Sequence, residues 1–378
     1  MLKKAFPILA LSVFSAMLGA GIILPLLPIY AEQMGATGIW VGIIYGGFFI
    51  ARITVMPIVG RLSDRKGRKS YLAIGLLAFA LVSLAYIPAS SVLQLSIVRF
   101  IHGATTGLIL PLAQAYVGDI SPEGEEGKWM GFFNAAFFTG FGTGPLIGGL
   151  LTEHFSMTVA FSTMSVLNFV AFLGVLFFLP AVKPRLAASS SLAFGKMRDS
   201  DTIRGLFTLR LSLSLGRGAF TSFLPIFAAL SLGLSTASVG VLLATNILLA
   251  SLIQGLTGSI ADRFSRRAVA ILGSVVNLVF LALIPLTDSF WPLLGICVLG
   301  GFSVALFMPA ISAIMIDEGR KFGMGATTAL VTIAMSIGMA IGPLVGGTIA
   351  DLANVNSAFY FAAGIVLIGT GLFAWFTR

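Results

Sequence analysis

Long apolar stretches alternate with short polar segments along the whole chain. Twelve of these stretches are long enough to cross a hydrocarbon core of ~30 Å as helices. The predicted spans are residues 6–31, 39–59, 70–89, 92–117, 129–151, 158–179, 205–230, 237–260, 268–287, 290–316, 326–350 and 355–376. Because the polar segments between them are short, the pattern predicts an all-α integral membrane protein with no large soluble domain.

Composition agrees with this pattern. Apolar residues make up 57% of the chain and charged residues 10%, and the mean hydropathy is +1.03. These values lie outside the range of soluble domains. Lys3 and Lys4 precede an apolar run that is too long for the core of a secretory signal, so we interpret that run as the first membrane helix.

Positive charge is distributed unevenly between the polar segments. With twelve spans both termini lie on one side, and every Lys and Arg outside the spans falls on that side. The positive-inside rule therefore predicts a multi-pass protein of the cell (inner) membrane with both termini cytoplasmic. The net charge of +9 is explained by this topology, so we expect the lipid bilayer and not a nucleic acid as the partner.

The chain also repeats itself at an offset of 198 positions. Asp64 in Ser-Asp-Arg corresponds to Asp262 in Ala-Asp-Arg, and Asp119 corresponds to Asp317. Such a repeat indicates two pseudo-symmetric six-helix bundles in the same orientation, a plan used by transporters. The predicted organisation is an N-terminal bundle of residues 1–180, a cytoplasmic linker of residues 181–204 and a C-terminal bundle of residues 205–378.

Three segments resemble motifs of one transporter family. The segment GRLSDRKGRK resembles the signature loop of the major facilitator superfamily, with Gly60, Asp64, Arg65, Gly67 and Arg68 at the signature positions. The segment GFGTGPLIGG resembles the glycine–proline motif of that family's proton-driven drug antiporters. The fourth span places Leu95, Arg99 and Gly103 at that branch's arginine motif, with His102 where glutamine is usual. The resemblance covers essentially the whole chain and implies the major facilitator fold.

The resemblance implies a gating role for the signature loop. If the bundles pack as in that family, Asp64 caps the helix that begins near Gly325. Repeat symmetry then assigns Asp262, beside Arg263, to the start of the fifth span. These contacts would close the cytoplasmic side and favour the outward-open state. The alternative is a solvated topology anchor whose arginines are attracted to anionic lipid headgroups.

Glycines recur every fourth residue in two of the spans. Gly140, Gly144 and Gly148 form one strip of the fifth span, and Pro145 can bend that helix. The eleventh span repeats the motif with Gly342, Pro343 and Gly346. A strip of this kind allows two backbones to approach closely, so we expect helices that seal and slide. Ordinary packing of small residues is the alternative.

The candidate chemistry lies in charged residues inside the spans, because charges there are costly. Arg99 and His102 share a helix face, and imidazole has an ordinary pKa near neutrality. Glu32, at the end of the first span, could pair with Arg99 or remain a solvated carboxylate. The candidates for proton coupling or substrate charge are Glu32, Arg52, Arg99, His102 and Arg217. Arg210 can snorkel to the cytoplasmic face and is assigned no function.

The spans contain arginines but no central carboxylate, which favours neutral, amphipathic or anionic substrates over strongly cationic ones. Adaptable cavity walls are predicted at Phe14, Met17, Phe220, Phe307 and Met308, although helix packing explains these residues equally well.

Enzymatic functions are disfavoured, because the chain lacks zinc-protease and phosphate-loop motifs and has only two histidines. We expect no metal, no cofactor and no ATP drive. Our first hypothesis is a monomeric secondary active exporter of small amphipathic or drug-like molecules, which works by alternating access in exchange for protons. The alternatives are a facilitator or symporter for a metabolite or lipid-like anion, and a transport-incompetent membrane sensor or scaffold on the same fold.

Overall fold

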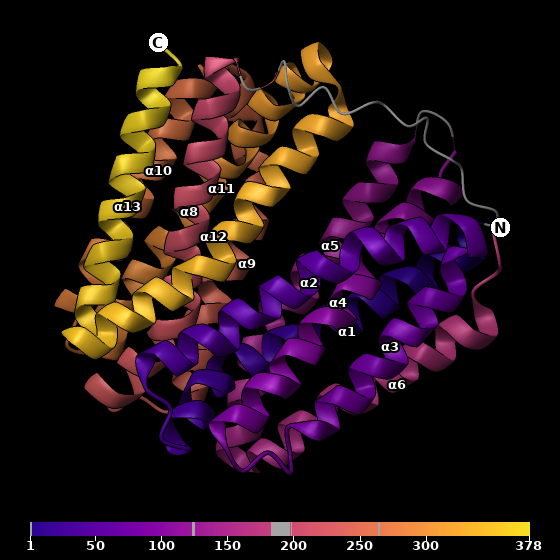
Figure 1. The fold of residues 1–378 in the computed structure, drawn as a ribbon, viewed down its shortest axis with the longest axis horizontal. Helices are drawn as coiled ribbons and strands as arrows, with labels where there is room; N and C mark the ends of the chain where they lie inside the picture. Colours follow the sequence, from indigo (N-terminus) through magenta and orange to yellow (C-terminus); the bar gives the residue numbers. More distant parts are fainter. Residues whose placement is uncertain (1, 123–124, 183–196, 198, 264) are drawn as a thin grey trace. The chain divides into compact units, whose positions relative to one another are not determined.

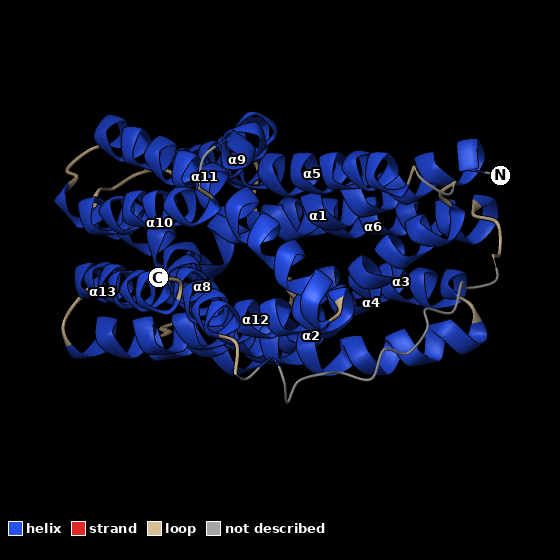
Figure 2. Cartoon of the chain, turned by 90° about the horizontal axis from the view of Figure 1, so that it is seen from above, coloured by secondary structure: helices blue, strands red, loops and turns tan. Residues whose placement is uncertain are grey.

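The structure is a computed structural model that describes residues 2–122, 125–182, 197, 199–263 and 265–378. Figure 2 shows that the described residues form helices joined by loops, without a strand. The helices are α1 (Leu2–Gln33), α2 (Gly38–Lys66), α3 (Arg68–Ala85), α4 (Val92–Ile120), α5 (Glu126–His154), α6 (Met157–Phe178), α8 (Asp201–Ile226), α9 (Thr236–Arg263), α10 (Arg266–Leu283), α11 (Phe290–Phe322), α12 (Met324–Leu352) and α13 (Val355–Phe376), with a π segment η1 (Phe227–Ser231) and a 3₁₀ segment η2 (Ile284–Leu286).

Within the described residues, twelve helices are long and apolar enough to cross a membrane. They overlap the twelve predicted spans, so the prediction of an all-α membrane protein is confirmed. Several helices extend beyond their predicted spans, most of all at the C-terminal ends of α2, which continues to Lys66, and α11, which continues to Phe322. Consequently the signature loop is almost entirely helical, and only Gly67, with a φ of 93°, separates α2 from α3.

Polar residues at the helix starts explain several boundaries. The side chains of Ser91, Ser156, Ser200, Ser265 and Asn354 each accept a hydrogen bond from a backbone N–H of the following first turn. In addition, Gly35 and Gly233 adopt φ values of 80° and 63° in the turns before α2 and α9. These two glycines are 198 positions apart, so the repeat includes backbone conformation.

Contacts divide the described chain into two compact units. The first unit holds α1, most of α2, and α3 to α6. The second holds α8, most of α9, and α10 to α13. Each unit also includes the first turns of one helix from the other half of the sequence: Ala36–Gly46 at the start of α2 lies in the second unit, and Ser235–Ala244 at the start of α9 lies in the first. The predicted linker falls mostly outside the described residues.

Helix packing is similar in the two units. In the first unit α1 packs along α5 and α6, and α3 lies beside α6 (Figure 1). In the second unit α8 packs along α12 and α13, and α10 contacts α11 and α13. Buried aromatic pairs fill both cores, such as Tyr86 with Phe161 in the first unit and Phe220 with Phe280 in the second.

Candidate functional site

The first unit contains a buried cationic cluster on α4. Arg99 is 4% exposed and His102 is fully buried. A guanidinium nitrogen of Arg99 lies 3.3 Å from Nδ1 of His102, and the hydroxyl of Tyr86 lies 2.9 Å from the same nitrogen. The guanidinium carbon also lies 4.2 Å from the ring centroid of Phe48. The rings of Phe79 and His102 pack edge-to-face, with their centroids 4.3 Å apart. The cluster therefore joins α2, α3 and α4.

These contacts assign the protonation form of the imidazole. A guanidinium can only donate, so Nδ1 of His102 must accept, and the ring proton then resides on Nε2. Nε2 is buried and has no hydrogen-bond partner among the described residues. A second positive charge at this distance from Arg99 would be repelled in a medium of low dielectric. The geometry therefore suits a neutral His102 that orients Arg99.

The other two charged candidates of the first unit lie on α1 and α2. Glu32 is half-buried near the end of α1, and the ion pairs of the described residues do not include one between Glu32 and Arg99. Arg52 is half-buried in α2, where its backbone contacts Gly107 of α4. The proposed proton transfer between Glu32 and Arg99 thus stays a prediction.

The second unit holds Arg217 at a comparable position. Its guanidinium donates to the side-chain oxygen of Asn246 in α9 and lies 5.2 Å from the ring centroid of Phe220. The amide nitrogen of Asn246 donates in turn to the carbonyl of Cys297 in α11 at 3.2 Å. This second bond holds the Asn246 oxygen toward Arg217.

The sequence repeat relates the two arginine environments. Phe48 and Asn246 are 198 positions apart, and so are Arg99 and Cys297. In the first unit Arg99 of α4 stacks on Phe48, whereas in the second unit Arg217 of α8 bonds to Asn246. Each unit therefore places a guanidinium beside the repeat-related position 48 or 246, although the arginine comes from α4 in the first unit and from α8 in the second.

Arg210 differs from the expectation that it snorkels to the membrane surface. Its two terminal guanidinium nitrogens each lie 2.9 Å from a thioether sulfur, one in Met308 of α11 and one in Met335 of α12. Its Nε is buried without a partner among the described residues. The side chain is therefore held between three helices of the second unit.

Ion pairs join the ends of consecutive helices in both units. Arg68, at the start of α3, pairs with Asp119 of α4 at 2.6 Å and with Asp64 of α2 at 3.3 Å. Its repeat partner Arg266 pairs with Asp317 of α11. The side chain of Asp119 is 5% exposed, whereas that of Asp64 is 46% exposed. The signature residues thus bind one another within the first unit.

The remaining residues of the signature loop are described only in part. Arg65 is exposed in the last turn of α2, and Gly60 is half-buried with no heavy atom within 4 Å of the position that a Cβ would take. The side chains of Asp262 and Arg263 lie outside the described part of the chain. Capping of helix starts by Asp64 and Asp262 stays a prediction.

The glycine–proline motifs of α5 and α12 each face two neighbouring helices within a unit. A Cβ at Gly140 would lie 2.5 Å from the carbonyl oxygen of Phe14, and one at Gly144 would lie 2.6 Å from that of Leu18. Gly148 likewise faces α1, at Ile22. In the repeat, Gly342 faces Leu215 of α8, and Gly346 contacts Phe223 of the same helix. The predicted strips therefore hold α5 against α1 and α12 against α8.

A second edge of the same helices meets the starts of α9 and α2. The carbonyl of Pro145 abuts Gly240, and a Cβ at Gly149 would lie 2.5 Å from the carbonyl oxygen of Thr236. In the second unit the carbonyl of Pro343 would lie 2.6 Å from a Cβ at Gly42. Each motif consequently supports two helix interfaces at once.

Two carboxylates that the sequence analysis did not select bind the starts of α2 and α9. Asp351 accepts hydrogen bonds from the backbone N–H groups of Gly38 at 2.5 Å and Ile39 at 2.8 Å. Glu153 accepts one from the N–H of Ala237 at 2.9 Å. An anionic cap at a helix N-terminus compensates unpaired N–H groups and the helix dipole. Both carboxylates and both capped turns are related by the repeat offset, which is the signal that could have revealed them.

The proposed cavity walls divide into buried and partly exposed side chains. Phe220 is fully buried against Phe280, and Met17 and Phe307 are 3% and 6% exposed. Phe14 and Met308 are half-buried. The first three residues occupy packed helix interfaces in this structure, and a wall role for any of the five stays a prediction.

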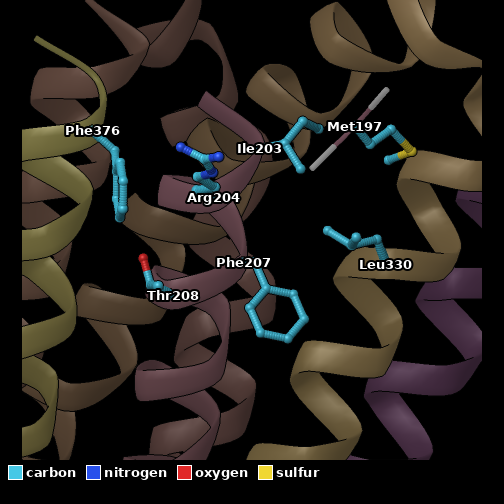
Figure 3. A pocket seen from close by; sticks show the side chains of 7 residues that line it. All are labelled: Met197, Ile203, Arg204, Phe207, Thr208, Leu330 and Phe376. Atoms are coloured by element: carbon cyan, nitrogen blue, oxygen red, sulfur yellow. The ribbon is translucent and has the colours of Figure 1, made fainter. Parts of the chain in front are cut away.

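An apolar pocket of about 370 Å³ lies beside α8 in the second unit. Figure 3 shows Phe376 and Thr208 toward one side of it, with Met197 and Leu330 toward the other. Arg204 is its charged lining residue, and this arginine pairs with Asp201 at 3.0 Å. The pocket therefore offers a mainly apolar surface next to a compensated charge.

The fold and these sites define a polytopic all-α membrane protein. The Major Facilitator Superfamily model matches residues 9–204 and 206–378, so the chain belongs to that family of secondary transporters and not to an enzyme family. The resemblance inferred from the motifs is thereby confirmed.

Individual proteins show the same relationship at low sequence identity. The chain is 27% identical to an uncharacterised MFS-type transporter of Methanocaldococcus jannaschii, over 96% of this chain and 95% of that protein. It is 26% identical to multidrug resistance protein 2 of Bacillus subtilis, over 98% of this chain and 94% of that protein. A bacterial homologue of the human lysosomal transporter Spinster shares the fold with a TM-score of 0.83 and 14% identity, over 100% of this chain and 97% of that one.

Proposed function

We propose that this transporter exports small amphipathic molecules by alternating access in exchange for protons. It acts as a monomer in the cell membrane, with both termini in the cytoplasm. The observation that carries the proposal is the buried cluster of Arg99 and His102 in α4 with Tyr86 directly after α3. The arginine–glycine pattern of the drug antiporter branch and the similarity to a protein named for multidrug resistance support it.

A permanent charge in a membrane helix requires compensation throughout the cycle. Arg99 cannot be deprotonated, and an unpaired charge in this environment costs several kcal/mol. In the described structure it uses an imidazole nitrogen and an aromatic face. A substrate anion and a carboxylate such as Glu32 can each replace these partners. The two anions then compete for the same arginine, so protonation of the carboxylate and release of the substrate are coupled. Such competition is the minimal requirement for exchange.

Flux in sealed proteoliposomes tests the exporter. An imposed pH gradient should drive movement of a fluorescent amphipathic probe, and Arg99→Ala should abolish that movement while the protein still folds. Arg99→Lys keeps the charge but loses the forked geometry, so it should retain only a small part of the flux. Full gradient-driven flux by Arg99→Ala would exclude this role and leave Arg217 as the stronger candidate.

A second candidate is a facilitator or symporter for an organic anion, favoured by the arginines Arg210 and Arg217 in α8. The same vesicles distinguish the two candidates, because a facilitator equilibrates its substrate without a gradient. A symporter instead accumulates substrate in the direction of proton flow.

A further inference from the structure

Arg210 has no strong hydrogen-bond acceptor in the described structure. Thioether sulfur accepts hydrogen bonds weakly, and the two terminal nitrogens of this guanidinium face the sulfur atoms of Met308 and Met335. Its Nε is buried and lacks a partner among the described residues. A cation held this way inside a membrane-spanning helix is only weakly compensated.

Arg217 extends the same face of α8. It follows Arg210 by seven residues, which is two helical turns or roughly 10 Å along the axis. It donates to the neutral Asn246. Among the described residues, neither guanidinium has a carboxylate within 4.0 Å, whereas Arg204 on the same helix pairs with Asp201. Both arginines are half-buried, so part of each side chain is accessible.

Met308 and Met335 suit an exchangeable coordination of the guanidinium. Their side chains are unbranched and polarisable, so they can withdraw without leaving a rigid gap. An incoming carboxylate offers two charged acceptors in the plane of the guanidinium and forms much stronger bonds than a thioether. The sulfur atoms then remain beside the ligand as an apolar wall.

The apolar pocket of Figure 3 lies beside α8, α12 and α13, so it shares two of the three helices around Arg210. It includes Phe207 and Thr208, within one turn of Arg210 on α8, and Leu330 of α12, which also carries Met335. This surface accommodates the apolar body of an amphipathic molecule. A charged headgroup at Arg210 with an apolar body along α8 and α12 satisfies both features.

We infer that Arg210, supported by Arg217, binds the carboxylate of an amphipathic organic anion between α8, α11 and α12. The inference rests on the proposed function only in assuming that the site belongs to a transporter. It names the substrate class, an organic monocarboxylate with an apolar body.

Equilibrium binding to the purified full-length protein in a nonionic detergent tests this site. Dansylglycine, dansylamide and dansylcadaverine share one fluorophore and carry a carboxylate, no charge and an ammonium group. We expect dansylglycine to bind at least about tenfold more tightly than dansylamide, and dansylcadaverine to bind most weakly. Equal affinities for the three probes in the unmodified protein would overturn the inference.

Variants separate an anion site from a structural arginine. Arg210→Gln should remove the preference for the carboxylate, and Arg217→Gln should reduce it. The double variant Met308→Leu with Met335→Leu should keep or strengthen the preference, because it removes competing acceptors and conserves volume. Arg320→Gln removes an exposed positive charge from α11 and is the matched control, with unchanged binding expected. Retained anion preference in folded Arg210→Gln would also overturn the inference.

If Arg210→Gln does not fold, Arg210→Lys and the methionine variant still test the site. Arg210→Lys should keep a weaker anion preference, since it retains charge without the fork. A methionine variant that folds but loses the carboxylate preference would contradict the exchange of thioether for carboxylate.

A further measurement identifies the source of the anion. Nanodiscs of phosphatidylcholine should show the same carboxylate preference as detergent, and added phosphatidylglycerol should not reduce it if the ligand is a soluble organic anion. Competition by phosphatidylglycerol would overturn the soluble source and assign the site to a lipid headgroup. Because binding is measured without a gradient, anion binding without flux would contradict the exporter alone. Gradient-driven flux without anion preference would contradict this site alone.

Discussion

At the scale of single residues, three arginines in the spans meet polar or aromatic side chains of neighbouring helices. Arg99 meets an imidazole and an aromatic face, Arg217 meets an amide, and Arg210 meets two thioethers. These partners are neutral, so none of them cancels the charge as a carboxylate would. In contrast, Arg68 at a helix end is paired with two carboxylates. Arg210 and Arg217, whose hydrogen-bond partners are thioethers and an amide, are therefore the groups most available to an anion.

The neutral form assigned to His102 leads to the first residue-scale prediction. His102→Gln supplies an amide oxygen that can accept from Tyr86 and Arg99 as Nδ1 does. We expect pH-driven flux to stay within about twofold of the unmodified protein, because the acceptor role is kept. His102→Leu keeps the volume but removes the acceptor and should lower flux strongly. Loss of pH dependence in folded His102→Gln would instead identify the imidazole as the proton carrier.

At the scale of helices, the glycines explain why particular pairs pack closely. A side chain at Gly144 would collide with the backbone of α1, at the carbonyl of Leu18 and at Gly21. Other helical glycines have free space instead, and Gly371 in α13 has no heavy atom within 4 Å of a Cβ position. The same residue type therefore has different roles on different helix faces.

This contrast predicts opposite effects of one substitution. Gly144→Ala should destabilise the protein by about 1–3 kcal/mol, because backbone atoms must shift to accept the methyl group. Gly371→Ala should be neutral or stabilising by up to about 1 kcal/mol, since alanine favours an open helical position. Thermal unfolding in detergent measures both. Equal midpoint temperatures of thermal unfolding for the two variants would contradict the packing role assigned to the glycine strip of α5.

At the scale of the whole molecule, the repeat produces matched contacts in the two units. Arg68 with Asp119 corresponds to Arg266 with Asp317. Near the C-terminal ends of α5 and α12, the cap by Glu153 corresponds to the cap by Asp351. A transporter that alternates access must break and re-form contacts at each end, and a charged cap on a helix start is a contact of moderate strength.

The cap by Asp351 is the basis of a prediction about access. Asp351→Asn weakens the interaction with the α2 start by about 0.3–1 kcal/mol, because the neutral amide no longer compensates the helix dipole. A single cysteine at Ala350, which faces Gly38, should then react about two- to fivefold faster with a maleimide. Cys297→Ser provides the background, and the repeat-related Glu153→Gln should add to the effect.

The control for this measurement is another carboxylate variant on the same side. Asp288 is exposed, and its hydrogen bond is to the neighbouring Ser289. Asp288→Asn should leave the labelling rate at position 350 unchanged. Equal rates in the Asp351→Asn, Glu153→Gln and double variants would show that these caps do not control access.

The amino-acid sequence alone determined the class of the protein, its twelve spans and its repeat. Span length and apolar character are local properties, and the offset of 198 positions is visible in the letters of the chain. The selection of Arg99, His102 and Arg217 as candidate residues followed from the cost of charge in a bilayer. The uneven distribution of Lys and Arg between the polar segments likewise predicted which side is cytoplasmic.

Only the tertiary structure decided which groups meet. Asp351 binds an N–H group 313 positions away, and Arg210 is held by sulfur atoms 98 and 125 positions away. The sequence placed Arg210 near enough to the surface to snorkel, because distance along a helix says nothing about the neighbouring helices. Contacts between helices depend on which face each one turns inward, and nearly uniform hydrophobicity around a membrane helix conceals that face. The partners of the buried charges were for this reason not predictable from the chain alone.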